Sequence, residues 1–348
     1  MNNNKMQISD YSYTLPKEKI AQHPPRVRGT SRLLVLHRDS GTVVDKQYAD
    51  IADFLQPGDV LVMNDTKVIK ARLIAQDEQG RSIELVLLEK HGHIEDKHHH
   101  KVLYRGKLSE GDVLRVGSTE LGVESIEDGG LAILASAEDI DALADAQGRV
   151  PLPPYMKRDA TAEDEQRYQT VFAREKGSVA APTASLNMTE ELLDLLRAKG
   201  VVVCSLTLHV GLGTFLPIRS DNVEDHTMHS EYYEIPSATI EYIREAKETG
   251  GRVVALGTTV ARTLEFASAD ILSPHSPRYL SGEANIFIYP GYTFKLVDAL
   301  LTNFHAPKST VLMLAAAFAS WDNLQSAYGH ALKNNYQFLS YGDSMLIL

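Results

Sequence analysis

The sequence predicts an α/β protein in two parts: a larger domain with a largely parallel sheet, and a small antiparallel β-barrel inserted into it. Two observations support this prediction. Strand-like and helix-like segments alternate from residue 150 to the end, whereas residues 67–148 contain short alternating runs with frequent glycines. We therefore expect residues 1–66 and 149–348 to form the larger, discontinuous domain, and residues 67–148 to form the inserted barrel domain.

The first segment of the larger domain contains two apolar runs that predict strands. Residues 33–36 read LLVL and residues 60–63 read VLVM, and the second run follows the turn residues Pro57, Gly58 and Asp59. Short apolar runs that begin after turn residues are typical of buried strands.

The barrel prediction depends on runs such as residues 83–88 and 113–116, which alternate or are apolar and are separated by glycines. The first amphipathic helix of this stretch is expected near residues 137–146. The histidine-rich stretch 95–101 is interpreted as a mobile polar loop, although clustered histidines can also bind a metal.

The second segment of the larger domain predicts alternating helices and strands. Residues 201–210 form a near-continuous apolar run, typical of a strand covered on both faces. The helix before it is expected to begin after the cap Thr189 and to end at Gly200. Helices are also expected over residues 237–249, from Thr258 onward and over 309–319, with strands over 252–256 and 286–289. This alternation favours a parallel sheet.

Composition limits the classes of function. A formal net charge of −11 argues against a protein that coats nucleic acid indiscriminately, but it leaves room for a local basic patch. The candidates for such a patch are Lys67, Arg72, Lys157 and Arg158, although ordinary solvated surface is the simpler interpretation.

The cysteine content and the length of the apolar runs suggest the cellular compartment of the protein. The single cysteine, Cys204, cannot form an intrachain disulfide, and the longest apolar run, residues 310–319, is about half of the ~20 residues that a membrane helix needs. No secretory signal is recognised at the start of the sequence. We expect a cytoplasmic protein.

Polar residues and glycines follow several predicted strands, where open sheets bind their ligands. The segments are Asn64-Asp65-Thr66, His209 to Phe215 with Gly211 and Gly213, and Gly257-Thr258-Thr259 with Arg262 in the following helix. Position 216 is leucine, so the third glycine of a dinucleotide fingerprint is missing. Each segment could equally be a structural turn.

Two further segments carry chemistry in their side chains. His226, His229 and Glu231 form an H-x-x-H-x-E pattern, but the spacing differs from that of zinc proteases, so no metal is predicted and a substrate contact or structural hydrogen bonding is preferred. Lys308 and Ser309 precede an apolar helix, where a positive charge and free N–H groups suit a carboxylate or phosphate. A capped buried helix with a surface lysine is the alternative.

Several longer motifs together resemble the S-adenosylmethionine:tRNA ribosyltransferase-isomerase family. They are GSVAAPT at residues 177–183, TLHVGLGTF at 207–215, PLPPY at 151–155, TNFH at 302–305 and SYGD at 340–343. The resemblance extends in order along essentially the whole chain. It implies an α/β domain with an inserted β-barrel.

The resemblance also implies a reaction. The ribosyl part of S-adenosylmethionine would be transferred to 7-aminomethyl-7-deazaguanine in a tRNA anticodon and isomerised, giving epoxyqueuosine with release of adenine and methionine. His209, His226 and His229 are candidates for the base because histidine titrates near neutral pH. Glu231 could orient one of them or act as the base itself. The residues expected to bind the donor are Asn64, Asp65, Thr66, Ser178, Pro182, Thr183, Gly211, Gly213, Thr214, Phe215, Thr258, Thr259, Arg262, Asn303, His305, Lys308 and Ser309.

The sequence departs from the family pattern in one signature segment. Where the family usually has APTAGLHFT, this chain has Ser185, Asn187 and Met188 in place of the glycine, histidine and phenylalanine. Asn187 cannot transfer protons as a histidine can, and Leu216 occupies a position that is usually basic. Two alternatives therefore stand beside the tRNA enzyme: a divergent paralogue that uses S-adenosylmethionine with a different, possibly small, acceptor, and a non-catalytic binding protein on the same fold.

Overall fold

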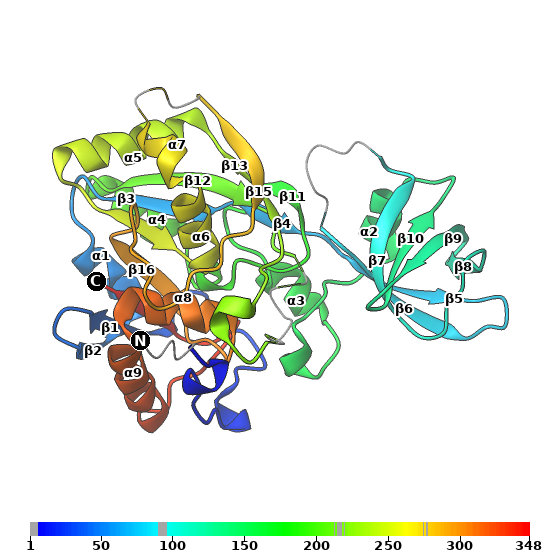
Figure 1. Ribbon diagram of the computed structural model, residues 1–348, viewed down its shortest axis with the longest axis horizontal. Coiled ribbons are helices and arrows are strands. Elements are labelled where there is room, and N and C mark those ends of the chain that lie inside the picture. Colours follow the sequence, from blue (N-terminus) through cyan, green and yellow to red (C-terminus); the bar gives the residue numbers. More distant parts are fainter. Residues whose placement is uncertain are drawn as a thin grey trace.

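The computed structural model describes residues 6–89, 96–211, 213, 218, 220–273, 275 and 278–348. Within these residues the chain forms a mixed sheet of nine strands, a closed barrel and a two-stranded ribbon. Figure 1 shows the barrel standing to one side of the larger body, joined to it by a narrow neck. The predicted fold class, a sheet domain with an antiparallel barrel, is confirmed.

The centre of the large sheet is parallel and its flanks are mainly antiparallel, although β1 pairs parallel with β17. Strands β12, β3, β14 and β16 run parallel to one another, whereas β13, β15 and β2 pair antiparallel with their neighbours. The order is β15 (Leu280–Ala284), β13 (Glu231–Ile235), β12 (Val202–Leu208), β3 (Val60–Asn64), β14 (Val253–Leu256), β16 (Ala299–Asn303), β17 (Ser344–Ile347), β1 (Arg32–His37) and β2 (Thr42–Gln47).

Helices cover both faces of this sheet. Alternate side chains of β1 enter different cores. Leu34 and Leu36 belong to the core that includes residues of α5 (Ser237–Thr249), α6 (Thr258–Phe266), α7 (Ser268–Leu272), α8 (Thr310–Ala319) and α9 (Trp321–Lys333). Leu33 and Val35 belong to the core that includes residues of α1 (Ile51–Phe54) and α4 (Glu190–Ala198). Because burying one such side chain contributes about 1.5–3 kcal/mol, a strand that is apolar on both faces is stable only between two layers.

The predicted capping residues lie at the ends of their helices. The hydroxyl of Thr189 accepts a hydrogen bond from the N–H of Leu192 at the start of α4, and that of Ser309 accepts one from Leu312 at the start of α8. Helix α5 ends at Gly250, whose φ of 82° is readily adopted only by a residue without a Cβ.

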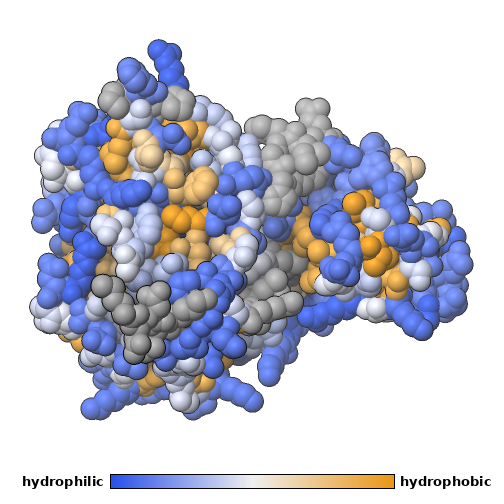
Figure 2. All heavy atoms as spheres, in the orientation of Figure 1, coloured by the Kyte–Doolittle hydropathy of each residue, from blue (hydrophilic) through white to orange (hydrophobic). Residues whose placement is uncertain are grey.

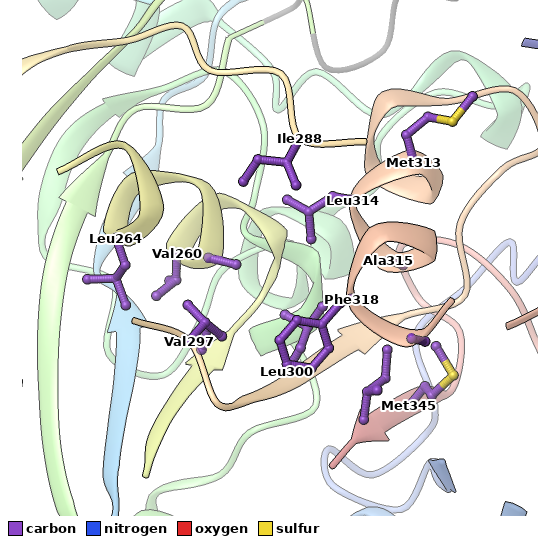
Figure 3. Close-up of a cluster of buried hydrophobic side chains, with 14 of the residues drawn as sticks. Val260, Leu264, Ile288, Val297, Leu300, Met313, Leu314, Ala315, Phe318 and Met345 are labelled. Carbon is purple, nitrogen blue, oxygen red and sulfur yellow. The ribbon is translucent and has the colours of Figure 1, made fainter. Parts of the chain in front are cut away.

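The strand predicted over residues 286–289 is not formed; the neighbouring strand is β15, at Leu280–Ala284. The segment is nevertheless apolar, because helix packing buries it. Figure 3 shows Ile288 pointing between α6 and α8, toward Leu314. Its side chain is buried by helix packing rather than by strand pairing, and apolarity alone does not separate the two.

The barrel closes in the order β10, β7, β6, β5, β8 and β9 within the described residues. Its strands are β5 (Arg72–Gln76), β6 (Ser82–Leu87), β7 (His99–Arg105), β8 (Val113–Val116), β9 (Thr119–Glu127) and β10 (Leu131–Ala135), and α2 (Ile140–Gln147) packs against it. The prediction of a mobile loop over 95–101 is wrong for its second half, because His99 and His100 begin β7. Residue 95 lies outside the described residues.

The neck between the two bodies is short and hydrogen-bonded. Strand β4 (Thr66–Val68) pairs parallel with β11 (Glu175–Ser178), and Arg72 exchanges backbone hydrogen bonds with Arg149. Helix α3 (Ala162–Arg167) lies on the larger body beside this neck. The division at residues 66/67 and 148/149 stays a prediction.

The face of the molecule seen in Figure 2 is mainly hydrophilic. Figure 2 shows apolar residues in separate patches on both bodies, surrounded by polar ones. Among the described residues, no helix combines the length and apolarity needed to cross a bilayer.

Candidate functional site

A cavity of about 510 Å³ opens in the larger body where β14 and β16 end and α6 and α8 begin. It is lined by stretches that lie far apart in the sequence: residues 154–155, 180–184, 257–259, 302–309 and 339–340, with Val210, Ile218 and Val311. The carboxyl ends of parallel strands are the usual place for a ligand in such sheets. Its volume lies within the range of small-molecule sites, roughly 300–1,000 Å³.

Of the predicted donor-binding residues, the cavity brings eight together: Pro182, Thr183, Thr258, Thr259, Asn303, His305, Lys308 and Ser309. Arg262 lies in an adjoining small pocket that shares Thr258 and Thr259 with the cavity. Thr214 and Phe215 fall outside the described residues.

Asn303 supplies an unused polar group to this cavity. The residue is 2% exposed, and its Oδ1 accepts a hydrogen bond of 2.9 Å from the hydroxyl of Thr183. Its Nδ2 is buried and has no hydrogen-bond partner among the described residues. A buried amide donor without an acceptor is costly. A ligand that offers a hydrogen-bond acceptor to Nδ2 would therefore be stabilised at this position.

His305 is buried on the same wall. Its ring Nε2 lies 3.0 Å from the hydroxyl of Thr302, and its backbone N–H donates to the hydroxyl of Tyr328. Burial lowers the pKa of His305 to about 3, so the ring is neutral near pH 7. It can exchange hydrogen bonds with a ligand, but it is a poor proton acceptor at neutral pH.

Lys308 stands at the start of α8 with a backbone φ of 58°. This left-handed conformation costs a non-glycine residue about 1–2 kcal/mol. It is held by the hydrogen bond from the N–H of Lys308 to the carbonyl of Tyr11. The side chain is exposed at the rim of the cavity, where the positive end of the α8 dipole adds to its charge. The rim therefore suits an anionic group.

A second set of polar side chains includes Arg262, which shares the adjoining small pocket with Thr258 and Thr259. Glu231 is fully buried on β13 and accepts a hydrogen bond of 2.9 Å from the N–H of Gly211. It is ion-paired with Arg262 and lies 3.2 Å from Nε2 of His229. Burial lowers the pKa of Arg262 to about 10, which leaves it charged at neutral pH. The guanidinium thus favours ionised Glu231, which orients the His229 ring.

The other two histidines have different surroundings. His226 contacts the ring of Phe287, and burial, then the charge of His229, lowers the pKa of His226. His209 receives or donates a 2.8 Å hydrogen bond at Nδ1 with the hydroxyl of Thr66. None of His209, His226 and His229 is among the described residues that line the cavity.

Close backbone approach explains two glycines of this region. A Cβ at Gly213 would overlap the ring of His229, and a Cβ at Gly177 would overlap the ring of His209. These positions admit only glycine while the histidines keep their places.

Some predicted donor-binding residues are instead used inside the fold. The amide of Asn64 bonds the backbone of Leu208, and Asp65 accepts hydrogen bonds from Ser205 and Thr207 and pairs with Arg174. The pKa of Asp65 is raised, because desolvation outweighs these bonds. Another such residue, Ser178, has a hydroxyl that bonds the backbone carbonyl of Ala180 and accepts from the N–H of Val210. The position of Asn64 and Asp65 after a strand and the place of Ser178 in the GSVAAPT motif predict a ligand role, but neither signal distinguishes a ligand contact from an internal one.

The departures from the family pattern lie in the interior, beside the cavity but not in its wall. Asn187 is 2% exposed and donates hydrogen bonds to the carbonyl of Gly342 and the hydroxyl of Ser344. Ser185 and Met188 are fully buried. Leu216 lies outside the described residues.

The predicted nucleic-acid contacts divide into two kinds. Arg72 is paired with Glu84 and Asp159, and Arg158 is paired with Asp164. In contrast, Lys157 is exposed and Lys67 half-buried, and neither forms an ion pair with a described residue.

The pattern analysis missed some groups near the site. Tyr155 and Ser340 share a hydrogen bond across the cavity wall, and Glu89 of the barrel lies against Gly211. Tyr155 and Ser340 belong to the PLPPY and SYGD motifs, which could have suggested them. Glu89 has no local signal in the sequence.

The chain matches the family model described as queuosine biosynthesis protein over residues 8–347. A relative from Pelodictyon phaeoclathratiforme, named S-adenosylmethionine:tRNA ribosyltransferase-isomerase, is 57% identical and covers 98% of this chain and 100% of its own length. One from Halothermothrix orenii with the same name is 46% identical and covers 99% and 100%. The crystal structure of S-adenosylmethionine tRNA ribosyltransferase from Thermotoga maritima is 35% identical and covers 97% and 100%, with a TM-score of 0.56. Matched from end to end in sequence and in fold, this chain belongs to the queuosine biosynthesis protein family.

Proposed function

We propose that this chain is an S-adenosylmethionine-dependent ribosyltransferase-isomerase. It transfers the ribosyl moiety of S-adenosylmethionine onto 7-aminomethyl-7-deazaguanine in tRNA and isomerises it, giving epoxyqueuosine with release of adenine and methionine. The observation that carries the proposal is the single cavity in which eight predicted donor-binding residues meet. Its size and its mixture of apolar wall and few polar groups suit one donor molecule.

The polar groups of the cavity match the two ends of that donor. The free amide face of Asn303 can pair with the edge of adenine, as asparagine does in nucleic-acid recognition. Lys308 and the first N–H groups of α8 can hold the methionine carboxylate. The ribose and the sulfonium would then lie between Asn303 and Lys308.

His229 is the best-supported candidate for the base. The sulfonium makes the neighbouring 5′ C–H acidic, so the reaction begins with proton removal. Glu231, kept ionised by Arg262, stabilises the protonated form of His229 once the proton has arrived. Glu231 is better suited to orientation than to being the base itself, because it is fully buried and already hydrogen-bonded.

Two remaining histidines fit other roles. His305 is neutral and buried, which suits hydrogen bonding to the donor rather than proton removal. The pKa of His226 is lowered, so it stays largely uncharged at neutral pH and its ring can pack beside the site. The proposal includes no metal. It assigns the reaction to the cytoplasm, in keeping with the expected compartment.

The alternative functions have less support. A changed acceptor would be favoured if Ser185, Asn187 or Met188 altered the cavity wall, but none of the three lines the cavity, and Asn187 is hydrogen-bonded in the interior. A non-catalytic role would leave the buried Glu231–Arg262 pair and the oriented His229 without a purpose.

The test is mass spectrometry of the protein incubated with S-adenosylmethionine, with and without tRNA that carries the aminomethyl base. We expect adenine and methionine only with that tRNA, and an epoxyqueuosine nucleoside after digestion. Donor consumption without the tRNA, or none with it, would overturn the proposal in favour of a repurposed paralogue.

A further inference from the structure

Glu89 is a barrel residue whose carboxylate reaches the larger body. It follows the end of β6, and it lies so close to Gly211 that a Cβ at that position would overlap the carboxylate. Its Oε2 is buried and accepts no hydrogen bond from the described residues. Because a buried carboxylate oxygen without a donor is costly, this arrangement calls for a partner that the described residues do not provide.

The position of Glu89 indicates which part of the site a group bound to its carboxylate would approach. The N–H of Gly211 donates to Glu231, and Val210, the preceding residue, lines the donor cavity. Glu89 therefore stands between the barrel and the groups proposed to act on the donor. The positive charge of Arg262 is paired with Glu231, and no described residue forms an ion pair with Glu89.

We infer that Glu89 binds the protonated aminomethyl group of the acceptor base and so makes the barrel part of acceptor selection. The inference rests on the proposed function, which supplies the chemical class of acceptor. A primary alkylamine is a cation near pH 7, as lysine is, and it carries N–H donors for the unsatisfied Oε2. Held there, the nitrogen lies beside the cavity that holds the ribose, and it can bond to the ribosyl carbon once the ammonium group has given up a proton.

The test uses binding without S-adenosylmethionine, so that no turnover occurs. Two anticodon stem-loop RNAs are compared, identical except that one carries the 7-aminomethyl base and the other a neutral 7-cyano base. We expect the unmodified protein to prefer the aminomethyl RNA by about tenfold or more, the value of a charge-assisted hydrogen bond. Glu89→Gln should abolish the preference and leave affinity for the 7-cyano RNA unchanged, and Glu89→Asp should restore part of it.

The matched control is Glu84→Gln, on the strand that Glu89 follows, because the carboxylate of Glu84 is already paired with Arg72. This variant should keep the preference. If Glu89 had only a structural role, Glu89→Gln would instead weaken the binding of both RNAs equally. Equal binding of the two RNAs by the unmodified protein, or an undiminished preference in Glu89→Gln, would overturn the inference. The turnover assay of the proposed function is separate, and its failure would show as absent adenine release by the unmodified protein.

Discussion

At the scale of single residues, two asparagines are equally buried but differ in how fully they are hydrogen-bonded. Asn187 and Asn303 are both 2% exposed. The amide of Asn187 donates to Gly342 and Ser344, whereas Asn303 lines the cavity and its Nδ2 has no hydrogen-bond partner among the described residues. Complete internal bonding indicates a structural residue, and unused bonding capacity in a cavity wall indicates a ligand contact.

This difference predicts opposite effects of one substitution. Asn303→Ala should weaken S-adenosylmethionine binding about three- to tenfold, the value of one neutral hydrogen bond, and change the free energy of unfolding little. Asn187→Ala should lower the free energy of unfolding by about 1–3 kcal/mol and leave donor affinity unchanged. Calorimetry and urea unfolding measure the two quantities. Equal donor affinity in Asn303→Ala and the unmodified protein would remove Asn303 from the site.

His305 predicts part of the acid sensitivity of the fold. Burial lowers its pKa to about 3 from an unfolded value near 6.5. Its stabilising effect is therefore fully present above pH 6.5 and is lost as the pH falls toward 3, because the unfolded chain then binds the proton more strongly. Between pH 7 and pH 5 the loss amounts to about 2 kcal/mol. His305→Gln should lose that much less over this interval in urea unfolding, and an identical loss would contradict the assignment.

At the scale of elements, the start of α8 combines strain with charge. Lys308 adopts a φ of 58°, yet its side chain stands at the cavity rim. A lysine in a conformation that glycine adopts without cost indicates that its side chain is needed there.

We expect Lys308→Gly to separate the two contributions. Relief of the left-handed strain should maintain or raise the free energy of unfolding by up to about 1 kcal/mol. Loss of the ammonium group should raise the KM for S-adenosylmethionine about tenfold, since charged hydrogen bonds contribute about 1.5–3 kcal/mol. Thermal unfolding and initial rates at varied donor concentration test both parts. An unchanged KM would show that Lys308 does not touch the donor.

The element scale also shows what the sequence could predict. Helices α4 and α8 begin where Thr189 and Ser309 cap them, because capping depends on neighbouring residues. The segment around Ile288 was mistaken for a strand, because helix packing buries it and apolarity is the same in both cases. Contacts between distant segments, such as Glu231 with Arg262, are absent from any local pattern.

The same reasoning divides the predicted site. Pro182, Thr183, Asn303 and His305 belong to the longer motifs, Thr258 and Thr259 follow a predicted strand, and all of them line the cavity. Asp65 also follows a strand and Ser178 also belongs to a motif, but both bond inward, and the sequence does not record the direction of a side chain. Glu89 was missed because its importance arises only when the barrel meets Gly211.

At the scale of the whole molecule, the chain is strongly acidic, with a net charge of −11, although its proposed acceptor is a polyanion. Binding then requires local cations that are not already neutralised. Arg158 is 18% exposed and paired with Asp164, whose pKa is lowered: burial would raise it, but hydrogen bonds from Arg158, Thr161 and Tyr341 prevail. Lys157, the preceding residue, is exposed and forms no ion pair among the described residues.

These adjacent residues provide a matched test of tRNA binding. Lys157→Gln should weaken binding at low salt and reduce the slope of log affinity against log salt by about 1, because one phosphate contact is lost. Arg158→Gln should leave the slope unchanged and lower the free energy of unfolding by about 3–5 kcal/mol, because Asp164 is left buried without its partner. Filter binding across a salt series measures the slope, and denaturant unfolding measures stability. If both variants shift the slope equally, Arg158 exchanges its partner for phosphate, and the neck region as a whole is part of the tRNA-binding surface. If neither does, the acceptor is held elsewhere, and the contact through Glu89 becomes the main expected link between the enzyme and the modified base.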